Sequence, residues 1–257
     1  MSVETHLHRA RERVGNEREA VATKRDALDR FADRIRQQSP SGTPTEPSGR
    51  PTGGGVTASA VSGATDDIEA VRTAFAGTVC THTAHDSVLT ALQRELGEEA
   101  ALALAPTTNA AFTPQIKGEL LSRTAARQHE LAATLTALDG EASGLEDHQE
   151  TVENLISWLT ETDETPLSAL GFDRLRARYD RLSEFRADCV ACLDERQAWL
   201  ASTTSEGGQV GVTHRSLVES LYDDFPVEYP VLATVTRLVS VCEDAQETIR
   251  AHLVRRA

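Results

Sequence analysis

The sequence predicts an all-α protein, in which a long antiparallel coiled-coil hairpin is joined by additional helices that form a bundle. Two observations predict this fold class. Apolar residues recur at seven-residue intervals in long stretches of the chain, which is the pattern of helices packed along a seam. Aromatic residues make up only 4% of the 257 residues, and the apolar residues are mostly Ala, Leu and Val, a composition that favours helices over sheets.

Residues 1–38 predict an N-terminal amphipathic helix. One heptad position holds Leu7, Val14, Val21, Leu28 and Ile35, and the companion position holds Val3, Ala10, Glu17, Lys24 and Phe31. The companion position is polar in its middle, so we expect this helix to pack on its partner through a narrow stripe. Residues 39–65 are rich in Pro, Gly, Ser and Thr and predict a flexible linker, with an average span of about 30 Å.

Residues 66–257 predict a helical domain, whose strongest signal begins at Thr113. Thr113 followed by Pro114 is a favoured helix start, because the hydroxyl caps free amides and proline lacks the amide that would be orphaned. Along the next 47 residues one heptad position holds Leu131, Leu138, Leu145, Val152 and Leu159, and the other holds Leu121, Leu135, Ala142 and Ile156 with Gln128 and Gln149. A helix from Pro114 to about Thr160 would be roughly 70 Å long, so much of it should be coiled coil.

A second long helix is expected from Asp173 to about Ser202, after a tight reversal at "ETDETPLSALGF". Its seam residues are Leu175, Leu182, Phe185, Cys189, Cys192 and Trp199. Two long helices with a short connection favour an antiparallel hairpin, here over residues 114–202. Further helices are expected over residues 214–254, interrupted by the turn "FPVEYP".

Charge and cysteine content indicate the chain's surroundings. The formal net charge is -14, and Lys24 and Lys117 are the only lysines. A charge of this sign normally argues against a nucleic-acid partner. However, this balance is expected of cytoplasmic proteins from salt-in halophiles, so the charge indicates adaptation to the solvent and says little about partners. The four cysteines do not form a disulfide framework and suit a reduced cytoplasm. An apolar run long enough for a membrane span and a secretory signal are both missing from the sequence, so we expect no membrane partner.

The hairpin and the C-terminal block resemble a family of haloarchaeal helical proteins that carry a domain of unknown function. The resemblance is strongest over residues 113–257, in "FTPQIKGELL", "ETPLSALGFDRLRARYDRL", "ERQAWL", "VGVTHRSLVESLYDDFPVEYPVLATVTRL" and the ending "HLVRRA". It implies a helical fold and a haloarchaeal source, but no activity. The family pattern has a histidine like His85 and an apolar residue where Cys80 stands, which argues against a family-wide metal site that uses Cys80.

The stretch "TVCTHTAHD" raises the possibility of a metal site. Its candidate ligands, together with a distant CxxC, are Cys80, His82, His85, Cys189 and Cys192. Structural zinc takes four Cys or His ligands, usually in close pairs from two turns. However, Cys189 and Cys192 also fit the hairpin seam as small buried hydrophobic residues, and Asp86 or Ser87 fits a helix cap. We therefore expect no cofactor, and a metal- or thiol-responsive regulator stays an alternative.

Three aromatic residues near two prolines are a candidate interaction patch: Tyr222, Phe225 and Tyr229. Aromatic residues are concentrated at interface hot spots, although a helix corner packed on the bundle is the favoured explanation for them. The spacing shows no nucleophile with a base and no small-molecule site. We therefore expect a non-enzymatic protein that acts through protein contacts or self-association. A weaker alternative is a DNA-associated regulator that uses the last two helices.

Overall fold

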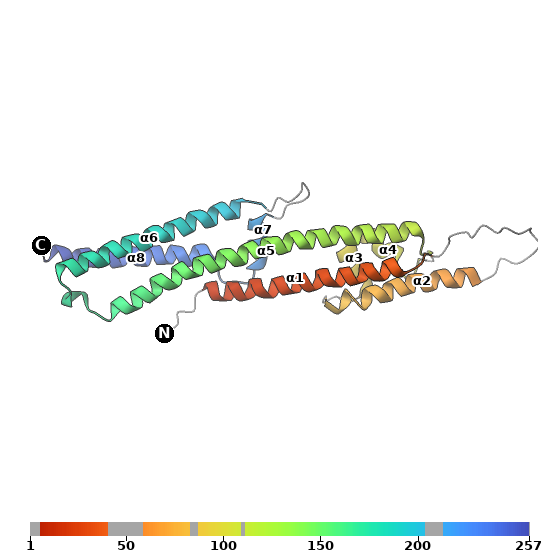
Figure 1. The fold of residues 1–257 in the computed structure, drawn as a ribbon, viewed down its shortest axis with the longest axis horizontal. Coiled ribbons are helices and arrows are strands. Elements are labelled where there is room, and N and C mark those ends of the chain that lie inside the picture. Colours follow the sequence, from red (N-terminus) through yellow and green to blue (C-terminus); the bar gives the residue numbers. More distant parts are fainter. Residues whose placement is uncertain (1–5, 41–58, 83–86, 109–110, 204–212, 257) are drawn as a thin grey trace, which may run out of the picture. The chain divides into compact units, whose positions relative to one another are not determined.

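A computed structural model describes residues 6–40, 59–82, 87–108, 111–203 and 213–256. This part of the chain contains eight α-helices and two short 3-10 helices (Figure 1). They are α1 (His6–Gln37), α2 (Ser59–Ala76), η1 (Cys80–His82), α3 (Val88–Leu96), α4 (Glu98–Ala103), α5 (Pro114–Asp163), η2 (Leu167–Ala169), α6 (Phe172–Ala201), α7 (His214–Leu221) and α8 (Pro230–Val254). Extended pairing in the described residues is limited to an isolated bridge between Thr203 and Thr213. The all-α prediction is therefore confirmed.

The chain divides into two compact units. The hairpin unit comprises residues 1–18 and 135–257, and the α2–α4 unit comprises residues 19–134. Helices α1 and α5 each contribute residues to both units. Within the part of the chain that the structure describes, no helix is long and apolar enough to cross a membrane.

The α2–α4 unit is built around apolar faces of α1 and α5. Its buried residues include Val21, Ala27, Leu28, Phe31, Ile35, Ile68, Val71, Phe75, Val79, Ala91, Leu92, Leu96, Ala100, Leu104, Phe112, Leu120 and Leu131. Phe31 of α1 and Phe75 of α2 meet edge to face, with ring centroids 5.2 Å apart. The heptad face predicted for the first helix is thus part of a real core, with α2 and α3 as additional partners.

One polar residue in the middle of the first helix, Lys24, is explained by a buried carboxylate. Glu95 of α3 has a side chain only 3% exposed, and it accepts hydrogen bonds from Lys24 Nζ at 2.8 Å and Arg127 Nε at 3.0 Å. Burial alone would raise the pKa of Glu95, but the hydrogen bonds and charges of Lys24 and Arg127 outweigh it and lower that pKa. Lys24 therefore fits at this seam position, because α3 supplies the carboxylate of Glu95 as its partner.

Helix starts follow the capping residues of the sequence. The Thr113 hydroxyl accepts a hydrogen bond from the Ile116 amide at 3.2 Å, as predicted for the start of α5. Ser87 caps α3, accepting from the Thr90 amide at 3.1 Å, whereas Asp86 lies outside the described residues. Helix α2 begins at Ser59, inside the stretch predicted as a linker over residues 39–65. Residues 59–64 are mostly Ala, Ser and Val, which a helix tolerates better than the prolines and glycines before them.

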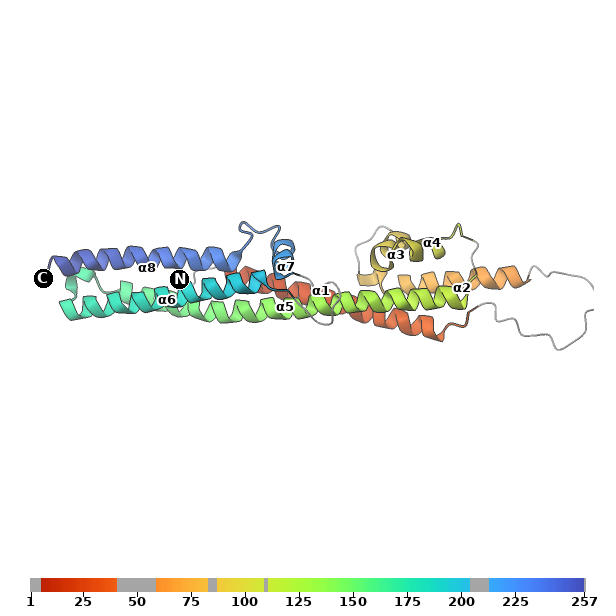
Figure 2. The ribbon, with the colours of Figure 1, turned by 90° about the horizontal axis from the view of Figure 1, so that it is seen from above.

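The hairpin unit contains the predicted antiparallel hairpin. Helices α5, α6 and α8 run side by side in both views (Figures 1 and 2). Contacts between α5 and α6 pair Glu141 with Arg196 near one end and Trp158 with Phe185 near the other, so the two helices are antiparallel. The core residues include Leu138, Leu145, Val152, Leu155, Leu175, Leu182, Phe185, Cys189, Leu200, Val231, Val235, Leu238, Cys242 and Ile249.

The seam prediction holds for most of its members. Leu131, Leu138, Leu145, Val152, Leu182 and Phe185 are buried. The other three predicted seam residues, Leu135, Leu159 and Trp199, are partly exposed. The start of α1 explains a polar seam residue of α5, because Arg11 Nη1 donates to the Gln149 side chain at 2.7 Å.

Candidate functional site

The predicted Cys and His ligands belong to different parts of the chain. Cys80 lies in η1 of the α2–α4 unit and is partly exposed, and Cys189 and Cys192 lie in α6 of the hairpin unit. The side chain of His82 and the whole of His85 lie outside the described residues. Among the residues that are described, no group of three or more Cys, His, Asp or Glu could hold a metal ion. The five-residue metal site therefore remains a sequence prediction.

The thiols of the hairpin unit are core residues. Cys189, Cys192 and Cys242 are buried and unpaired. Burial, and after it the neighbouring thiols of Cys242 and Cys192, raises the pKa of Cys189 to about 12. Burial also raises the pKa values of Cys192 and Cys242. A protonated thiol is a poor nucleophile and a poor metal ligand, so the packing interpretation of the CxxC accounts for what the structure shows.

One of the three residues predicted to form an aromatic interaction patch is buried. Tyr222 is fully buried, and its hydroxyl donates to Glu141 Oε1 at 2.7 Å. Phe225 packs on Tyr222 with ring centroids 5.0 Å apart, and the Tyr229 hydroxyl donates to Glu219 at 2.9 Å. The prediction of an exposed patch of Tyr222, Phe225 and Tyr229 is therefore wrong for Tyr222, because this tyrosine is buried at the end of α7. The other two remain partly exposed.

Tyr222 belongs to a buried charged network that the sequence analysis missed. Arg196 Nη1 and Nη2 donate to the two carboxylate oxygens of Glu141 at 2.6 and 2.9 Å. The side chains are 2% and 0% exposed. The guanidinium also lies over Trp199, 4.5 Å from the ring centroid, and Trp199 stacks on His214 with centroids 4.1 Å apart. The three hydrogen bonds to the buried Glu141 carboxylate therefore join α5, α6 and the α7 corner.

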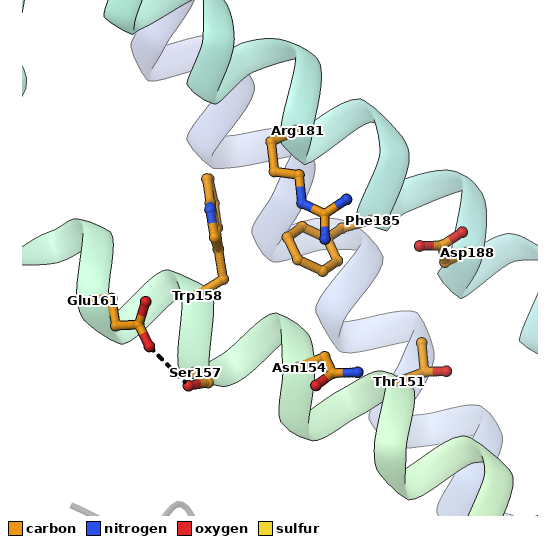
Figure 3. Close-up of a pocket in the computed structure, with 8 residues that line it drawn as sticks. All are labelled: Thr151, Asn154, Ser157, Trp158, Glu161, Arg181, Phe185 and Asp188. Atoms are coloured by element: carbon orange, nitrogen blue, oxygen red, sulfur yellow. Dashed lines mark hydrogen bonds between the residues drawn. The ribbon is translucent and has the colours of Figure 1, made fainter.

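A groove between α5 and α6 is open to solvent, with a volume of about 470 Å³. Its lining residues are Thr151, Asn154, Ser157, Trp158 and Glu161 of α5 with Arg181, Phe185 and Asp188 of α6 (Figure 3). The Trp158 and Phe185 rings lie 5.5 Å apart, and the Arg181 guanidinium lies 4.1 Å from the centroid of Phe185. Trp158 is partly exposed, whereas Phe185 is 3% exposed. We call these eight residues the α5–α6 groove.

A second hollow continues from the groove toward the reversal of the hairpin. It has a volume of about 250 Å³ and is lined by Leu159, Leu182 and Ile249 among others, and it shares Trp158 with the α5–α6 groove. Trp158 therefore contributes to two adjoining hollows on the same half of the hairpin. The sequence analysis did not select it, although a tryptophan is a notable residue in a chain that contains two.

The chemistry of the α5–α6 groove suits contact better than catalysis. Its hydroxyl groups are engaged in ordinary helix contacts, such as the Ser157 hydroxyl that donates to Glu161 at 3.3 Å. Its centre is an aromatic pair with a stacked guanidinium, and its rim carries the polar side chains of Thr151 and Asn154 and the carboxylates of Glu161 and Asp188. An aromatic centre with arginine and a polar rim is the composition of a protein interface.

Comparison with known proteins identifies a family. Neither the curated proteins nor the solved structures contain a match to the chain. The sequence profile of a domain of unknown function, DUF7260, matches residues 5–246 and so covers both units. The predicted membership of an uncharacterised domain family is thereby confirmed, and the chain belongs to the DUF7260 family.

Proposed function

We propose that the protein is a non-enzymatic helical protein that acts through protein–protein contacts made by the α5–α6 groove. The observation that carries this proposal is the position of Trp158, which lies partly exposed between two hollows and against the Phe185 ring. Tryptophan and arginine are the residues most enriched at energetic hot spots of interfaces. Here Trp158 and Arg181 flank one buried phenylalanine.

The arrangement of helices supports a helical binding partner. The α5–α6 groove is lined by residues of α5 and α6 alone, while α8 runs alongside the same pair (Figures 1 and 2). Antiparallel helix pairs accept further helices in their grooves, as in helical bundles. A helix that lies in this groove would cover Trp158 and make contact with the polar rim.

The buried polar groups of the hairpin unit support a structural interpretation. Glu141 is fully occupied by Arg196 and Tyr222, and Cys189 and Cys192 are packed in the core. No observation favours a thiol-responsive role, because burial raises the pKa values of both thiols.

We further propose that the protein works in the reduced, salt-rich cytoplasm of a haloarchaeon, as its scarcity of lysine and its net charge of -14 suggest.

Site-specific photocrosslinking tests the proposed contact surface. We expect a benzoylphenylalanine at Asn154, an exposed groove residue, to form covalent protein adducts in cells that produce the chain naturally. The matched control carries the same group at Arg176, which lies on α6 outside the groove with a side chain 72% exposed. Replacing Trp158 with alanine should remove the Asn154 adducts and leave those at Arg176 unchanged, because truncating a hot-spot tryptophan costs more than about 2 kcal/mol of binding.

Equal adduct yields at the two positions would overturn the proposal. So would Asn154 adducts that persist unchanged when Trp158 is replaced. Circular dichroism of each variant checks that the helices remain folded.

A further inference from the structure

We propose that the second hollow, beside the reversal of the hairpin, binds a free α-amino acid with an apolar side chain, such as leucine. This inference goes beyond the proposed contact function, which uses the neighbouring α5–α6 groove. It is carried by three features that the hollow combines: an apolar wall, a guanidinium, and a carboxylate that is not paired with that guanidinium.

The hollow is bounded by several elements. Its lining residues come from the end of α5, the reversal with Pro166 and Leu167, the first half of α6 and the second half of α8. Its volume of about 250 Å³ is just below the roughly 300–1,000 Å³ of sites for drug-sized ligands, so it suits a smaller molecule. Apolar walls with a few polar groups are typical of small-molecule sites. The sequence does not indicate this site, because its residues come from separate segments.

Both helices of the hairpin change from charged to apolar in the same direction. Asp163 ends α5, and Leu159 lies one turn before it. Arg178 of α6 is followed one turn later by Leu182. Because α5 and α6 are antiparallel, both steps lead away from the reversal, by about 6 Å along the helix axes. The hollow therefore has a charged end at the reversal and an apolar wall about one turn further along, where Ile249 of α8 is also buried.

The charged end holds two opposite charges that are not paired. Asp163 and Arg178 are the only charged residues among those that line the hollow. The Arg178 guanidinium donates to the Thr165 carbonyl at 3.3 Å, and the backbone places Thr165 at most roughly 7 Å from Asp163. Within the described part of the chain, the two charges form no ion pair with each other, and the Asp163 carboxylate accepts no hydrogen bond. Such an arrangement suits a ligand that carries both charges itself.

A zwitterion with an apolar substituent complements all three features. Its carboxylate can accept hydrogen bonds from the Arg178 guanidinium, a charge-assisted pairing for which arginine is well suited. Its ammonium group can donate to Asp163. The side chain then extends along the wall formed by Leu159, Leu182 and Ile249, where the burial of apolar surface is favourable. A fatty acid would leave Asp163 without a partner, and an alkylamine would leave Arg178 without one.

Two hydroxyl groups of the hollow also favour an apolar ligand side chain. Thr162 Oγ1 donates to the Trp158 carbonyl at 2.8 Å, and Thr248 Oγ1 donates to the Asp244 carbonyl at 2.9 Å. Both hydroxyl protons are therefore used within their own helices. Neither is available to a polar ligand side chain.

Isothermal titration calorimetry of the full chain in KCl tests this inference with defined probes. Leucine, isoleucine or phenylalanine is expected to bind saturably. 4-Methylpentanoate keeps the side chain and carboxylate of leucine but lacks the ammonium group, 3-methylbutylamine lacks the carboxylate, and glycine lacks the side chain. Each of these three should bind at least about tenfold more weakly than leucine, because each leaves one feature of the hollow unmatched.

Replacing the two charges separately identifies the residues that hold the ligand. Arg178→Gln and Asp163→Asn should each weaken leucine binding at least about tenfold, because each removes one charge-assisted pairing. The matched controls are Arg176→Gln and Asp180→Asn, which remove the same charges from exposed residues of α6 outside the hollow. Both controls should bind leucine like the natural chain, and circular dichroism checks that every variant keeps its helices.

No binding of leucine, isoleucine or phenylalanine at up to about 10 mM would overturn the inference. So would leucine binding that is matched by 4-methylpentanoate or glycine, or that is retained in both Arg178→Gln and Asp163→Asn, since the two charges would then not hold the ligand. The proposed function is tested separately, because the Asn154 adducts report a protein partner in the α5–α6 groove and require no amino acid.

Discussion

Replacing Glu141 with alanine is expected to lower the free energy of unfolding of the hairpin unit by about 3–5 kcal/mol, the usual cost of breaking a buried ion pair from one side. Glu141 is 0% exposed and accepts both hydrogen bonds of the Arg196 guanidinium together with that of the Tyr222 hydroxyl. Alanine leaves the positive charge of Arg196 buried without a counter-charge. Arg196 Nε already has no partner among the described residues, so the guanidinium has little compensation.

Denaturant unfolding followed by tryptophan fluorescence measures this effect. Both tryptophans of the chain, Trp158 and Trp199, lie in the hairpin unit, so their emission reports that unit. The control is the apolar replacement of the whole network, Glu141→Leu with Arg196→Met and Tyr222→Phe. Buried ion pairs replaced by apolar residues of similar volume are often neutral or more stable, so we expect this triple variant to be more stable than Glu141→Ala. A loss below about 1 kcal/mol for Glu141→Ala would show that the charge is not buried as the structure describes.

Replacing Glu95 with glutamine is expected to destabilise the α2–α4 unit by about 1–3 kcal/mol at neutral pH, because the charged partners Lys24 and Arg127 lose their shared carboxylate. Lys24 and Arg127 are 27% and 29% exposed, so solvent moderates the loss. The natural chain should also lose stability in acid. The pKa of Glu95 is lower in the folded chain than in the unfolded chain, so its contribution is complete above the unfolded value of about 4.3 and disappears as the pH falls through the folded value.

Hydrogen exchange of the α3 amides is the measurement for this unit, since its residues include no tryptophan. Protection of α3 should fall in the Glu95→Gln variant at neutral pH, and the difference from the natural chain should shrink as the pH is lowered below 4.3. Glu99→Gln is the matched control, because Glu99 also pairs with an arginine, Arg123, but its side chain is 79% exposed. Equal losses of protection in the two variants would contradict a special role for the buried carboxylate.

The sequence predicted the backbone architecture well because heptad repeats and caps are local signals. Thr113 marked the start of α5, and the seam positions at Leu138, Leu145 and Val152 are buried as expected. The reversal between Asp163 and Phe172 also lies where the periodicity stopped. These features depend on residues that are close in sequence.

The remaining features depend on partners that are distant in sequence. Lys24 is a charged residue at an otherwise apolar heptad position, and its partner Glu95 is 71 residues away. Arg196 occupies the same heptad position as Leu182 and Cys189, so a stricter reading of that position would have revealed a buried charge on the hairpin seam.

The candidate site was the least predictable part. Heptads indicate which face of α5 is apolar, but they do not show which stretch of that face lacks a covering helix. Trp158 stands one residue before the predicted seam residue Leu159, and only the structure shows that it borders two hollows. Tyr222 shows the opposite case, because this aromatic residue near two prolines is buried and donates a hydrogen bond to a carboxylate 81 residues away.

The most direct measurement of the central claim is the solvent exposure of Trp158 when the protein associates. Trp199→Phe leaves Trp158 as the sole tryptophan and keeps an aromatic ring between Arg196 and His214. Acrylamide quenching and emission wavelength of this variant are then followed as the protein associates with its partner. If the α5–α6 groove is the contact surface, quenching falls and the emission shifts to shorter wavelength in step with association, because the partner covers the indole. Association that leaves both quantities unchanged would contradict the claim, since Trp158 would then lie outside the contact.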